Sequence, residues 1–354
     1  MHRCLELAKL GAGNVAPNPM VGAVLVFDEQ IIGEGYHQKY GEAHAEPNCI
    51  RQATANGNNA LISRSTLYVS LEPCVHFGKT PPCADLIIAN KIPKVVIGCR
   101  DPFKQVNAVV DDAVGQVKGV EKLRNAGIEV EVGILEDKCI DLNRRFLGFH
   151  TQHRPYIILK WAQTLNHKIA GQGSDRLHIT NDFTNRIVHK WRSEEASILI
   201  GTNTALNDDP ELTTRMWPGK NPTRLVVDLG LKLPSRLKLF DGQAKTIVFN
   251  TQKHEENGNV SFYQVREDVS LVHQITNALY QLKILSVIVE GGAKLLQSFI
   301  EEDMWDEARV ITNEELIVKD GLEAPQFISA SKTEEQKLFT DKIEFFRPHH
   351  RSSS

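Results

Sequence analysis

The sequence lacks a long apolar run, an export signal and an excess of positive charge, and each absence excludes a class of protein. No stretch of about 18 apolar residues occurs, so we expect no membrane span. The first residues, Met1 to Glu6, lack the apolar core of a signal peptide. The 41 Lys and Arg residues are outnumbered by 44 Asp and Glu residues, which disfavours nucleic acid as a partner. We therefore expect a cytoplasmic enzyme.

Cysteine is also scarce. Six cysteines in 354 residues are too few for a disulfide scaffold, and without an export signal we expect them to stay reduced. The chain has 41% hydrophobic and 24% charged residues, as soluble globular proteins do, and it is long enough for two domains.

Strands and helices alternate in the first half, which predicts a layered α/β domain. Strands are expected over 21–27, 31–36, 67–71, 95–99 and 128–133. Helices are expected over 4–10, from 44 onward, and over 83–90 and 120–126. The irregular stretch 107–119 is expected to be an exposed loop.

After Pro155 the alternation starts again, which predicts a second α/β domain with a larger sheet. Its strands are expected over 156–161, 197–200, 225–228, 246–250 and 286–290, and its helices over 182–193, 271–282 and 294–300. The segment 137–154 is the expected junction. We place the domains at 1–146 and 147–354.

Three potential zinc ligands and one carboxyl group occur in order: His44-Ala45-Glu46, then Pro73-Cys74, then Cys83. This order matches the H-x-E…P-C-x-x-C signature of zinc-dependent deaminases. One imidazole and two thiolates leave one of the four zinc positions for water, whose pKa zinc lowers to about 7. Glu46 can then move protons between this water and a leaving amine. The pattern predicts a catalytic zinc site with His44, Cys74 and Cys83 as ligands.

The spacing of the cysteines departs from that signature. Eight residues separate Cys74 from Cys83, where the signature has two. Both thiolates can still reach one ion if Cys83 stands at the start of the following helix, whose dipole favours a thiolate. A structural zinc ion, with the second half acting as a nucleotide-binding sensor, is an alternative interpretation.

Several longer motifs resemble the RibD family, the bifunctional pyrimidine deaminase/reductases of riboflavin biosynthesis. In the first half these are residues 17–24 (PNPMVGAV), His44-Ala45-Glu46 and 72–83 (EPCVHFGKTPPC), which include the long loop between the cysteines. In the second half they are Leu159-Lys160, residues 201–210 (GTNTALNDDP) and 289–292 (VEGG). The resemblance implies a cytidine-deaminase-like three-layer domain followed by a dihydrofolate-reductase-like α/β domain.

The resemblance also implies two reactions on one small-molecule intermediate. The first domain would use Zn²⁺ to remove the 2-amino group of 2,5-diamino-6-(5-phosphoribosylamino)pyrimidin-4(3H)-one by hydrolysis. The second would use NADPH to reduce the ribosyl group of 5-amino-6-(5-phosphoribosylamino)uracil to ribityl. Glu46 would carry protons, Asn18 would contact the pyrimidine, and His76 and Lys79 would lie near the phosphoribosyl group. We also expect a homo-oligomer.

In the reductase half, the resemblance implies two sets of contacts. The substrate set is Arg176, Arg192, Leu212, Arg215 and Glu290. The cofactor set is Ala162, His178, Thr204, Asp208, Gly292, Ala293, Lys294, Leu295, Leu296, Gln297 and Ser298. Independently of the resemblance, a strand, two glycines and a helix start at 286–300 would expose backbone N–H groups to a phosphate.

The reductase half also departs from the family pattern. Residues 164–168 read Thr-Leu-Asn-His-Lys, where the family has Ser/Thr-Leu-Asp-Gly-Lys/Arg, and Arg176 and His178 replace a small polar residue and an aromatic. The competing enzyme interpretation is a nucleoside deaminase, or a deaminase of tRNA adenosine or cytidine, fused to an unrelated nucleotide-binding domain.

Overall fold

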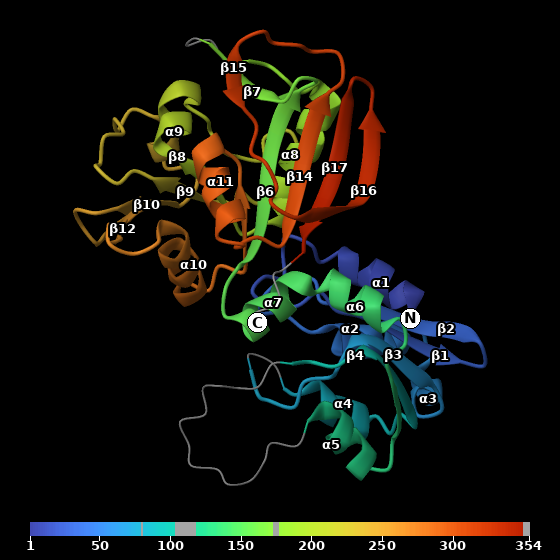
Figure 1. Ribbon diagram of the computed structural model, residues 1–354. Helices are drawn as coiled ribbons and strands as arrows, with labels where there is room; N and C mark the ends of the chain where they lie inside the picture. Colours follow the sequence, from blue (N-terminus) through green and yellow to red (C-terminus); the bar gives the residue numbers. More distant parts are fainter. Residues whose placement is uncertain (79–80, 103–117, 173–176, 350–354) are drawn as a thin grey trace. The chain divides into compact units, whose positions relative to one another are not determined.

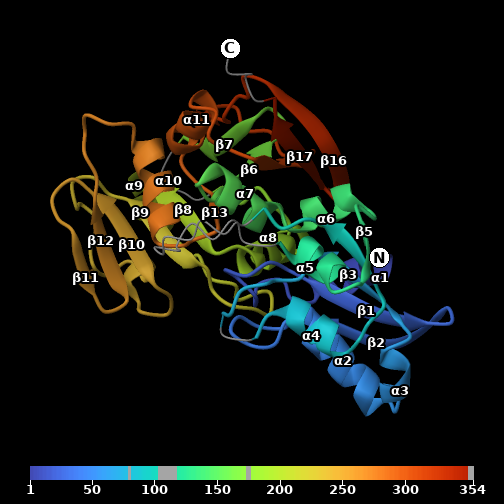
Figure 2. The same ribbon diagram turned by 90° about the horizontal axis from the view of Figure 1, so that it is seen from below.

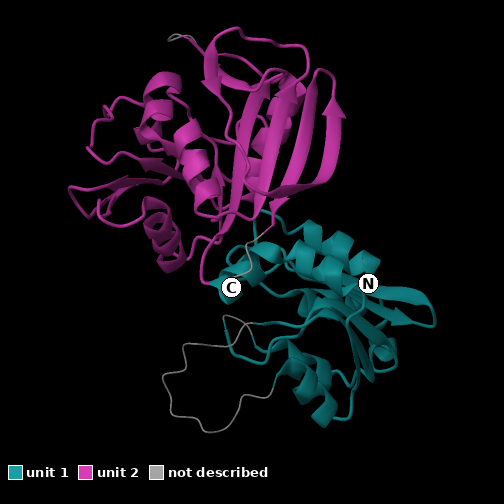
Figure 3. Cartoon of the chain, in the orientation of Figure 1, with its two compact units in different colours: residues 1–152 teal, residues 153–354 magenta. Residues whose placement is uncertain are grey.

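The chain, seen here as a computed structural model, divides into two compact units, residues 1–152 and 153–354 (Figure 3). The structure describes residues 1–78, 81–102, 118–172 and 177–349. None of the helices in these residues combines the length and the apolar composition that a membrane span requires. The boundary expected after residue 146 falls inside helix α7 (Arg144–Gln152), whereas the compact unit keeps this helix whole. The functional domain boundary stays a prediction.

Unit 1 holds one five-stranded sheet with the strand order β2-β1-β3-β4-β5 (Figure 1). Strand β1 is antiparallel to both β2 and β3, while β3, β4 and β5 are parallel. The elements of this unit, in chain order, are α1 (His2–Lys9), β1 (Gly22–Phe27), β2 (Gln30–Tyr36), α2 (Ala45–Ala55), α3 (Asn59–Ile62), β3 (Thr66–Leu71), α4 (Cys83–Ala89), β4 (Lys94–Cys99), α5 (Gly119–Asn125), β5 (Glu129–Val132), α6 (Glu136–Leu142) and α7.

Helices cover both faces of this sheet because successive strand side chains point to opposite faces. Ala23 and Leu25 of β1 pack into a core with buried residues of α2, α4 and α5, and α2 and α4 lie side by side in Figure 2. Val24, between them, packs on the opposite face against α1, and α6 joins α1 there through Cys139. The three-layer architecture predicted for the first half is confirmed.

Unit 2 is built around a ten-stranded sheet with the order β11-β12-β10-β9-β8-β13-β6-β14-β17-β16, and β15 and β7 form a separate pair. The strands from β12 to β14 in this order are parallel, and antiparallel strands flank them on both sides. The elements are β6 (Tyr156–Thr164), β7 (Lys168–Gly171), α8 (Asp182–Glu194), β8 (Ser197–Gly201), α9 (Thr202–Asp208), β9 (Thr223–Val227), the 3-10 helix η1 (Lys238–Phe240), β10 (Thr246–Asn250), β11 (Glu255–Asn257), β12 (Val260–Gln264), α10 (Leu271–Gln281), β13 (Ser286–Val289), α11 (Ala293–Glu301), β14 (Glu307–Asn313), β15 (Gly321–Glu323), β16 (Ala330–Leu338) and β17 (Asp341–Pro348).

This second sheet is also covered on both faces. Ile157 and Leu159 of β6 pack with buried residues of α10 and α11, whereas Ile158, between them, packs with Val188 and Trp191 of α8. Figure 1 shows α11 in front of the central strands and α8 behind them. The fold class predicted for the second half, an α/β domain, is confirmed.

The predictions miss several elements, among them the buried strand β14 and the exposed strand β16. Strand β16 is the edge of its sheet, and its residues are mostly exposed and polar, so no alternation of apolar and polar residues marks it. The expected junction at 137–154 is mostly helical, because it contains α6 and α7. Of the expected loop at 107–119, residues 107–117 lie outside the described residues.

Candidate active sites

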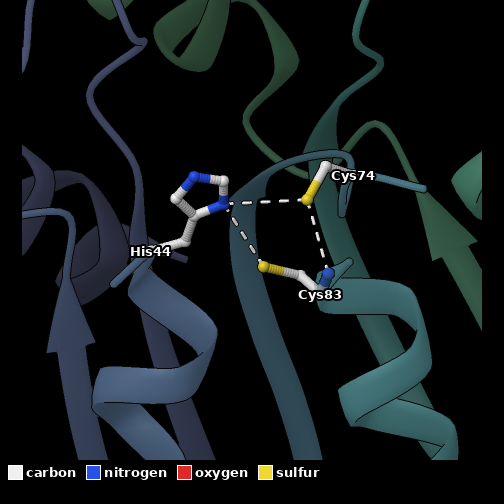
Figure 4. Close-up of side chains that lie close together, drawn as sticks. All are labelled: His44, Cys74 and Cys83. Carbon is white, nitrogen blue, oxygen red and sulfur yellow. Dashed lines mark hydrogen bonds between the residues drawn. The ribbon is translucent and has the colours of Figure 1, made fainter. Parts of the chain in front are cut away.

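Three side chains from separate elements of unit 1 converge on one point (Figure 4). His44 is the N-cap residue of α2, Cys74 follows the end of β3 after two residues, and Cys83 is the first residue of α4. Figure 4 shows the His44 Nδ1 atom turned toward both sulfur atoms, at 3.6 Å from Cys74 Sγ and 3.4 Å from Cys83 Sγ. All three ligand atoms lie within 4.8 Å of one another.

These separations fit a tetrahedral zinc ion. Zn–N and Zn–S bonds of ordinary length at a tetrahedral angle place the nitrogen and each sulfur about 3.6 Å apart. The donor set, one imidazole and two thiols, is of the kind that zinc prefers. The eight-residue spacing of the cysteines therefore does not prevent their side chains from meeting at one site. These three residues would hold the ion, and the fourth position would stay open to water.

Two further features of this site favour its chemistry. The backbone N–H of Cys83 donates to Cys74 Sγ at 3.3 Å, and hydrogen bonds from Cys83 and His44 lower the pKa of the Cys74 thiol. Glu46, in the first turn of α2, is 3% exposed, and its carboxyl group lies within hydrogen-bond reach of Cys83. Burial raises the pKa of Glu46, which suits a carboxyl group that gives and takes protons.

Asn18 is joined to the site through a histidine that the sequence analysis missed. His37 is buried, and its ring lies edge-on to the His44 ring with 5.2 Å between centroids. The Asn18 Nδ2 atom lies 3.1 Å from His37 Nε2, and His37 Nδ1 lies 3.0 Å from the Ala43 carbonyl oxygen. His37 is therefore a neutral donor to Ala43 and acceptor from Asn18, consistent with the burial that lowers its pKa. His76 is half-buried near the cysteines, and Lys79 lies outside the described residues.

Two of the charged residues predicted for the reductase half, Arg192 and Glu290, meet at the carboxyl end of β13. Glu290 directly follows this strand, and Arg192 of α8 donates to both its carboxylate oxygens, at 3.0 and 2.6 Å. Lys160 of β6 lies 3.9 Å from the same carboxylate. Burial raises the pKa of Glu290, but Arg192 and Lys160 more than offset this and lower it to about 2. Glu290 is therefore ionised at neutral pH.

Two predicted cofactor segments, far apart in the chain, also come together. Thr204 lies in the first turn of α9, and Gly291 and Gly292 lead into α11. A Cβ atom on Gly291 would lie 2.8 Å from Thr204 Cγ2, so only glycine allows this approach. Gly292 adopts a φ of 76° as the N-cap of α11. The N–H groups at this helix start form the kind of cradle that binds a dinucleotide phosphate.

The remaining predicted contacts in α11 differ in what their side chains do. Leu296 is 1% exposed and packs in the sheet core, so only its backbone could reach a cofactor. Gln297 exchanges hydrogen bonds with the backbone of Gln326, and Ser298 donates to the Leu295 carbonyl. Ala293 stands at the helix start, and Lys294 is exposed beside it.

The other predicted residues of this half lie on several elements. Leu212 is buried with a φ of 53°, and exposed Arg215 pairs with Glu211 at 3.3 Å. Ala162 lies in β6 opposite Ile311 of β14. Asp208 ends α9, and His178 is exposed. Arg176 lies outside the described residues.

Comparison with known proteins gives both halves a family. Residues 1–99 match the model of the cytidine and deoxycytidylate deaminase zinc-binding region, and residues 155–315 match that of the RibD C-terminal domain. The riboflavin biosynthesis protein RibD of Aquifex aeolicus is 39% identical over 97% of this chain and 94% of its own length. RibD of Escherichia coli is 32% identical over 92% of this chain and 93% of its own.

The chain belongs to the RibD family. It is a bifunctional enzyme with a zinc-binding deaminase domain and a reductase domain. A crystal structure from Thermotoga maritima, named a diaminohydroxyphosphoribosylaminopyrimidine deaminase/5-amino-6-(5-phosphoribosylamino)uracil reductase, is 37% identical with a TM-score of 0.86. The match covers 98% of this chain and 97% of the Thermotoga maritima chain.

The departure from the RibD pattern at 164–168 has a structural account. His167 stands where the family has glycine, and its φ is 59°, a conformation that glycine adopts without cost. The ring is held there, because Gln163 Nε2 lies 3.0 Å from His167 Nδ1. Asn166, where the family has Asp, donates to the Val318 carbonyl and accepts from the Val318 N–H. The turn is thus kept with different side chains.

The sequence analysis gave no site role to three residues of these units: His37 and His189, which it did not name, and Lys160, which it named only as part of a motif. For Lys160 a signal existed, because it is a lone charge in the apolar run Tyr156 to Trp161. His37 follows a strand and His189 lies in an amphipathic helix, where a histidine is usually a core residue. Only the fold places these two beside the other site residues.

Proposed function

We propose that the chain catalyses two consecutive steps of riboflavin biosynthesis on one phosphorylated intermediate. The first is hydrolysis of the 2-amino group of 2,5-diamino-6-(5-phosphoribosylamino)pyrimidin-4(3H)-one, which consumes water and releases ammonia. The second is reduction of the ribosyl group of the resulting 5-amino-6-(5-phosphoribosylamino)uracil by NADPH. The observation that carries this proposal is the convergence of His44, Cys74 and Cys83 beside Glu46, in a chain of the RibD family.

In the deaminase site, His44, Cys74 and Cys83 hold the metal and Glu46 moves protons. Bound zinc supplies a Lewis acid that activates water at neutral pH. The Glu46 carboxylate accepts one proton from the attacking water and delivers it to the pyrimidine ring nitrogen, then takes the second proton from the added hydroxyl and delivers it to the departing amine. Asn18, oriented by His37, hydrogen-bonds the pyrimidine. His76 and Lys79 follow Cys74 on the loop that we assign to the phosphoribosyl group.

In the reductase site, the charged cluster binds the sugar phosphate and the α11 start binds the cofactor. Bound NADPH supplies the hydride. Arg192 and Arg215 offer guanidinium groups to the phosphate, and Leu212 and Arg176 complete the substrate contacts. Glu290, ionised between Arg192 and Lys160, faces the ribosyl chain and orients both cations. Thr204 and residues 292–298 contact the cofactor, with Ala162, His178 and Asp208 completing its site.

We further infer a cytoplasmic homo-oligomer without nucleic-acid or membrane partners, with the functional boundary between residues 146 and 147. The slight excess of acidic over basic residues supports the absence of a nucleic-acid partner. Native mass spectrometry of the purified chain tests the oligomeric state. Expression of residues 1–146 and 147–354 as separate proteins tests the boundary.

The most direct experiment supplies the diaminopyrimidine phosphate with and without NADPH and follows ammonia and NADPH together. We expect ammonia in both reactions, and NADPH consumption only after ammonia has been released. Adenosine and cytidine serve as comparison substrates. Ammonia from a nucleoside but none from the diaminopyrimidine phosphate would overturn the proposal.

A further inference from the structure

The loop that carries Asn18 is held by a buried asparagine from the C-terminal part of unit 1. Asn143 stands between α6 and α7 and is 2% exposed. Its Oδ1 atom accepts a hydrogen bond from the Met20 N–H at 2.8 Å, and its Nδ2 atom donates to the Met20 carbonyl at 2.9 Å. One side chain, 123 positions away in the sequence, therefore pairs with both backbone groups of Met20.

The loop has few backbone donors by which it could be held. Pro17 and Pro19 have no N–H, so between residues 17 and 20 only Asn18 and Met20 can donate a backbone hydrogen bond. The Asn18 N–H closes a turn to the Val15 carbonyl at 2.9 Å. The Met20 N–H is the second donor, and it goes to the asparagine side chain.

Strand β1 does not extend far enough to hold Met20 in the sheet. Its ladder with β3 begins at Ala23, and the Gly22 N–H donates to the Ser70 hydroxyl at 3.1 Å. Side chains therefore replace a neighbouring strand here, Ser70 for Gly22 and Asn143 for Met20. Backbone groups that are shielded from water need such partners, so the loop depends on the Asn143 amide.

The Asn143 amide is itself held firmly, because two helices fix its backbone. The Asn143 N–H donates to the Ile140 carbonyl of α6 at 3.1 Å, and its carbonyl accepts from the Leu147 N–H of α7 at 2.9 Å. The short side chain adds only two torsions between this backbone and the amide. Met20 is thus tied to a rigid point of unit 1.

Proline passes this constraint on to Asn18. Pro19 lies between Met20 and Asn18, its ring fixes its own φ, and it restricts the residue before it to extended conformations. The backbone of Asn18 therefore has little freedom once Met20 is placed. Its side chain meets His37, with 3.1 Å between Asn18 Nδ2 and His37 Nε2. Asn18 is fixed at its side chain by His37 and at its backbone through Met20.

We propose that Asn143 is a positioning residue of the deaminase site, which fixes Met20 and thereby sets the Asn18 amide in place for the pyrimidine ring. This inference rests on the proposed function, in which Asn18 binds the pyrimidine. Asn143 acts through the loop and does not itself bind the substrate. Its loss should weaken binding of the diaminopyrimidine phosphate and leave the zinc ligands and the proton transfers of Glu46 intact.

The test compares Asn143→Leu, which keeps the side-chain volume but removes both hydrogen bonds, with Asn143→Gln, which keeps an amide. For Asn143→Leu we expect the KM for the diaminopyrimidine phosphate to rise about fivefold, with the kcat for ammonia release within about twofold of the parent chain. Bound zinc and NADPH oxidation on supplied aminouracil phosphate should not change. Asn143→Gln should recover part of the lost affinity.

Asn58→Leu is the matched control for a loss of stability alone. Asn58 also lies in unit 1, and its amide donates to the Ile32 carbonyl at 3.0 Å, so this variant likewise loses a bond from a side-chain amide to the backbone. We expect its melting temperature to fall and its KM for the diaminopyrimidine phosphate to match that of the parent.

A double-mutant cycle with Asn18→Ala separates positioning from a structural role. If Asn143 acts through Asn18, Asn143→Leu should change the KM little in the Asn18→Ala background. An unchanged KM in Asn143→Leu alone, an equal rise in both backgrounds, or a parallel loss of kcat and bound zinc would overturn the inference.

If Asn143→Leu does not fold, Asn143→Ser, which keeps one hydrogen-bonding group, takes its place in the same cycle, and the same outcomes decide. A parent chain that releases no ammonia from the diaminopyrimidine phosphate would instead refute the proposed function itself.

Discussion

The two sites differ in how their key groups are held. In unit 1, an imidazole and two thiols stand at the separations that a tetrahedral cation requires. In unit 2, Arg192 and Glu290 already neutralise each other through two hydrogen bonds. The types of donor atom in a metal site indicate which ion the site binds. An ion pair gives no such indication of a ligand, because the same two residues could simply stabilise the fold.

This difference explains why the motif in the first half was decisive and the residues of the second half were not. Softness, number and spacing of donors restrict the partner of His44, Cys74 and Cys83 to very few ions. A single arginine does not restrict the choice of ligand in this way. Substitutions in either site test whether the two sites act independently and whether they are held together in different ways.

Glu46→Gln should have the largest effect. Removing the proton carrier is expected to lower the deaminase kcat by about 10²- to 10⁴-fold, while zinc content and the reductase activity on supplied aminouracil phosphate stay unchanged. Ammonia release, NADPH oxidation and bound zinc are the three measurements. Glu42→Gln, an exposed carboxylate near the same helix, is the control. A structural zinc site predicts that Glu46→Gln alters neither activity.

Arg192→Leu should come next, because it leaves Glu290 buried without its closest cation. We expect the reductase activity to be lost and the free energy of unfolding of unit 2 to fall by about 3–5 kcal/mol. Thermal unfolding and NADPH oxidation measure the two effects, and Arg186→Leu, exposed on the same helix, is the control. If the deaminase activity of Arg192→Leu fell as far as its reductase activity, the two sites would not be independent.

Gly292→Ala should have a moderate effect confined to cofactor binding. Alanine is strained at a φ of 76°, at a cost of about 1–2 kcal/mol, so the KM for NADPH should rise about tenfold. The deaminase should not change. Gly148→Ala is the control, since this helical glycine has open space around it. A normal NADPH affinity in Gly292→Ala would remove the α11 start from the cofactor site.

The smallest expected effect is on the pH dependence of the stability of unit 2. The pKa of His189 is lowered from 6.5 to about 4, so the unfolded chain takes up this proton first and the stability of unit 2 should fall as the pH falls from 6.5 to 4. Glu290, lowered from 4.5 to about 2, adds a further loss between those values. The melting temperature of His189→Gln should depend less on pH than that of the parent between pH 6.5 and 4. Equal pH dependence of the two melting temperatures would contradict the lowered pKa of His189.

The sequence predicted many of the elements that carry a strong apolar pattern, though not the buried strand β14, and it predicted the candidate donors that carry specific chemistry. Strands β1, β3 and β10 and helix α8 formed close to the expected residues, because burial imposes their periodicity. Strand β16 escaped prediction because an exposed edge imposes none. Likewise, nothing local distinguishes His189 or His37 from an ordinary buried histidine.

By itself, then, the sequence determined the α/β class, the two halves and the candidate zinc donors, since these depend on short-range periodicity and on the chemistry of individual side chains. Only the tertiary structure decided that Arg192 would neutralise Glu290, 98 positions away, and that Gly291 would press against Thr204. Such contacts follow from the order of strands in a sheet. That order is set by how whole elements pack, and no local run of residues encodes it.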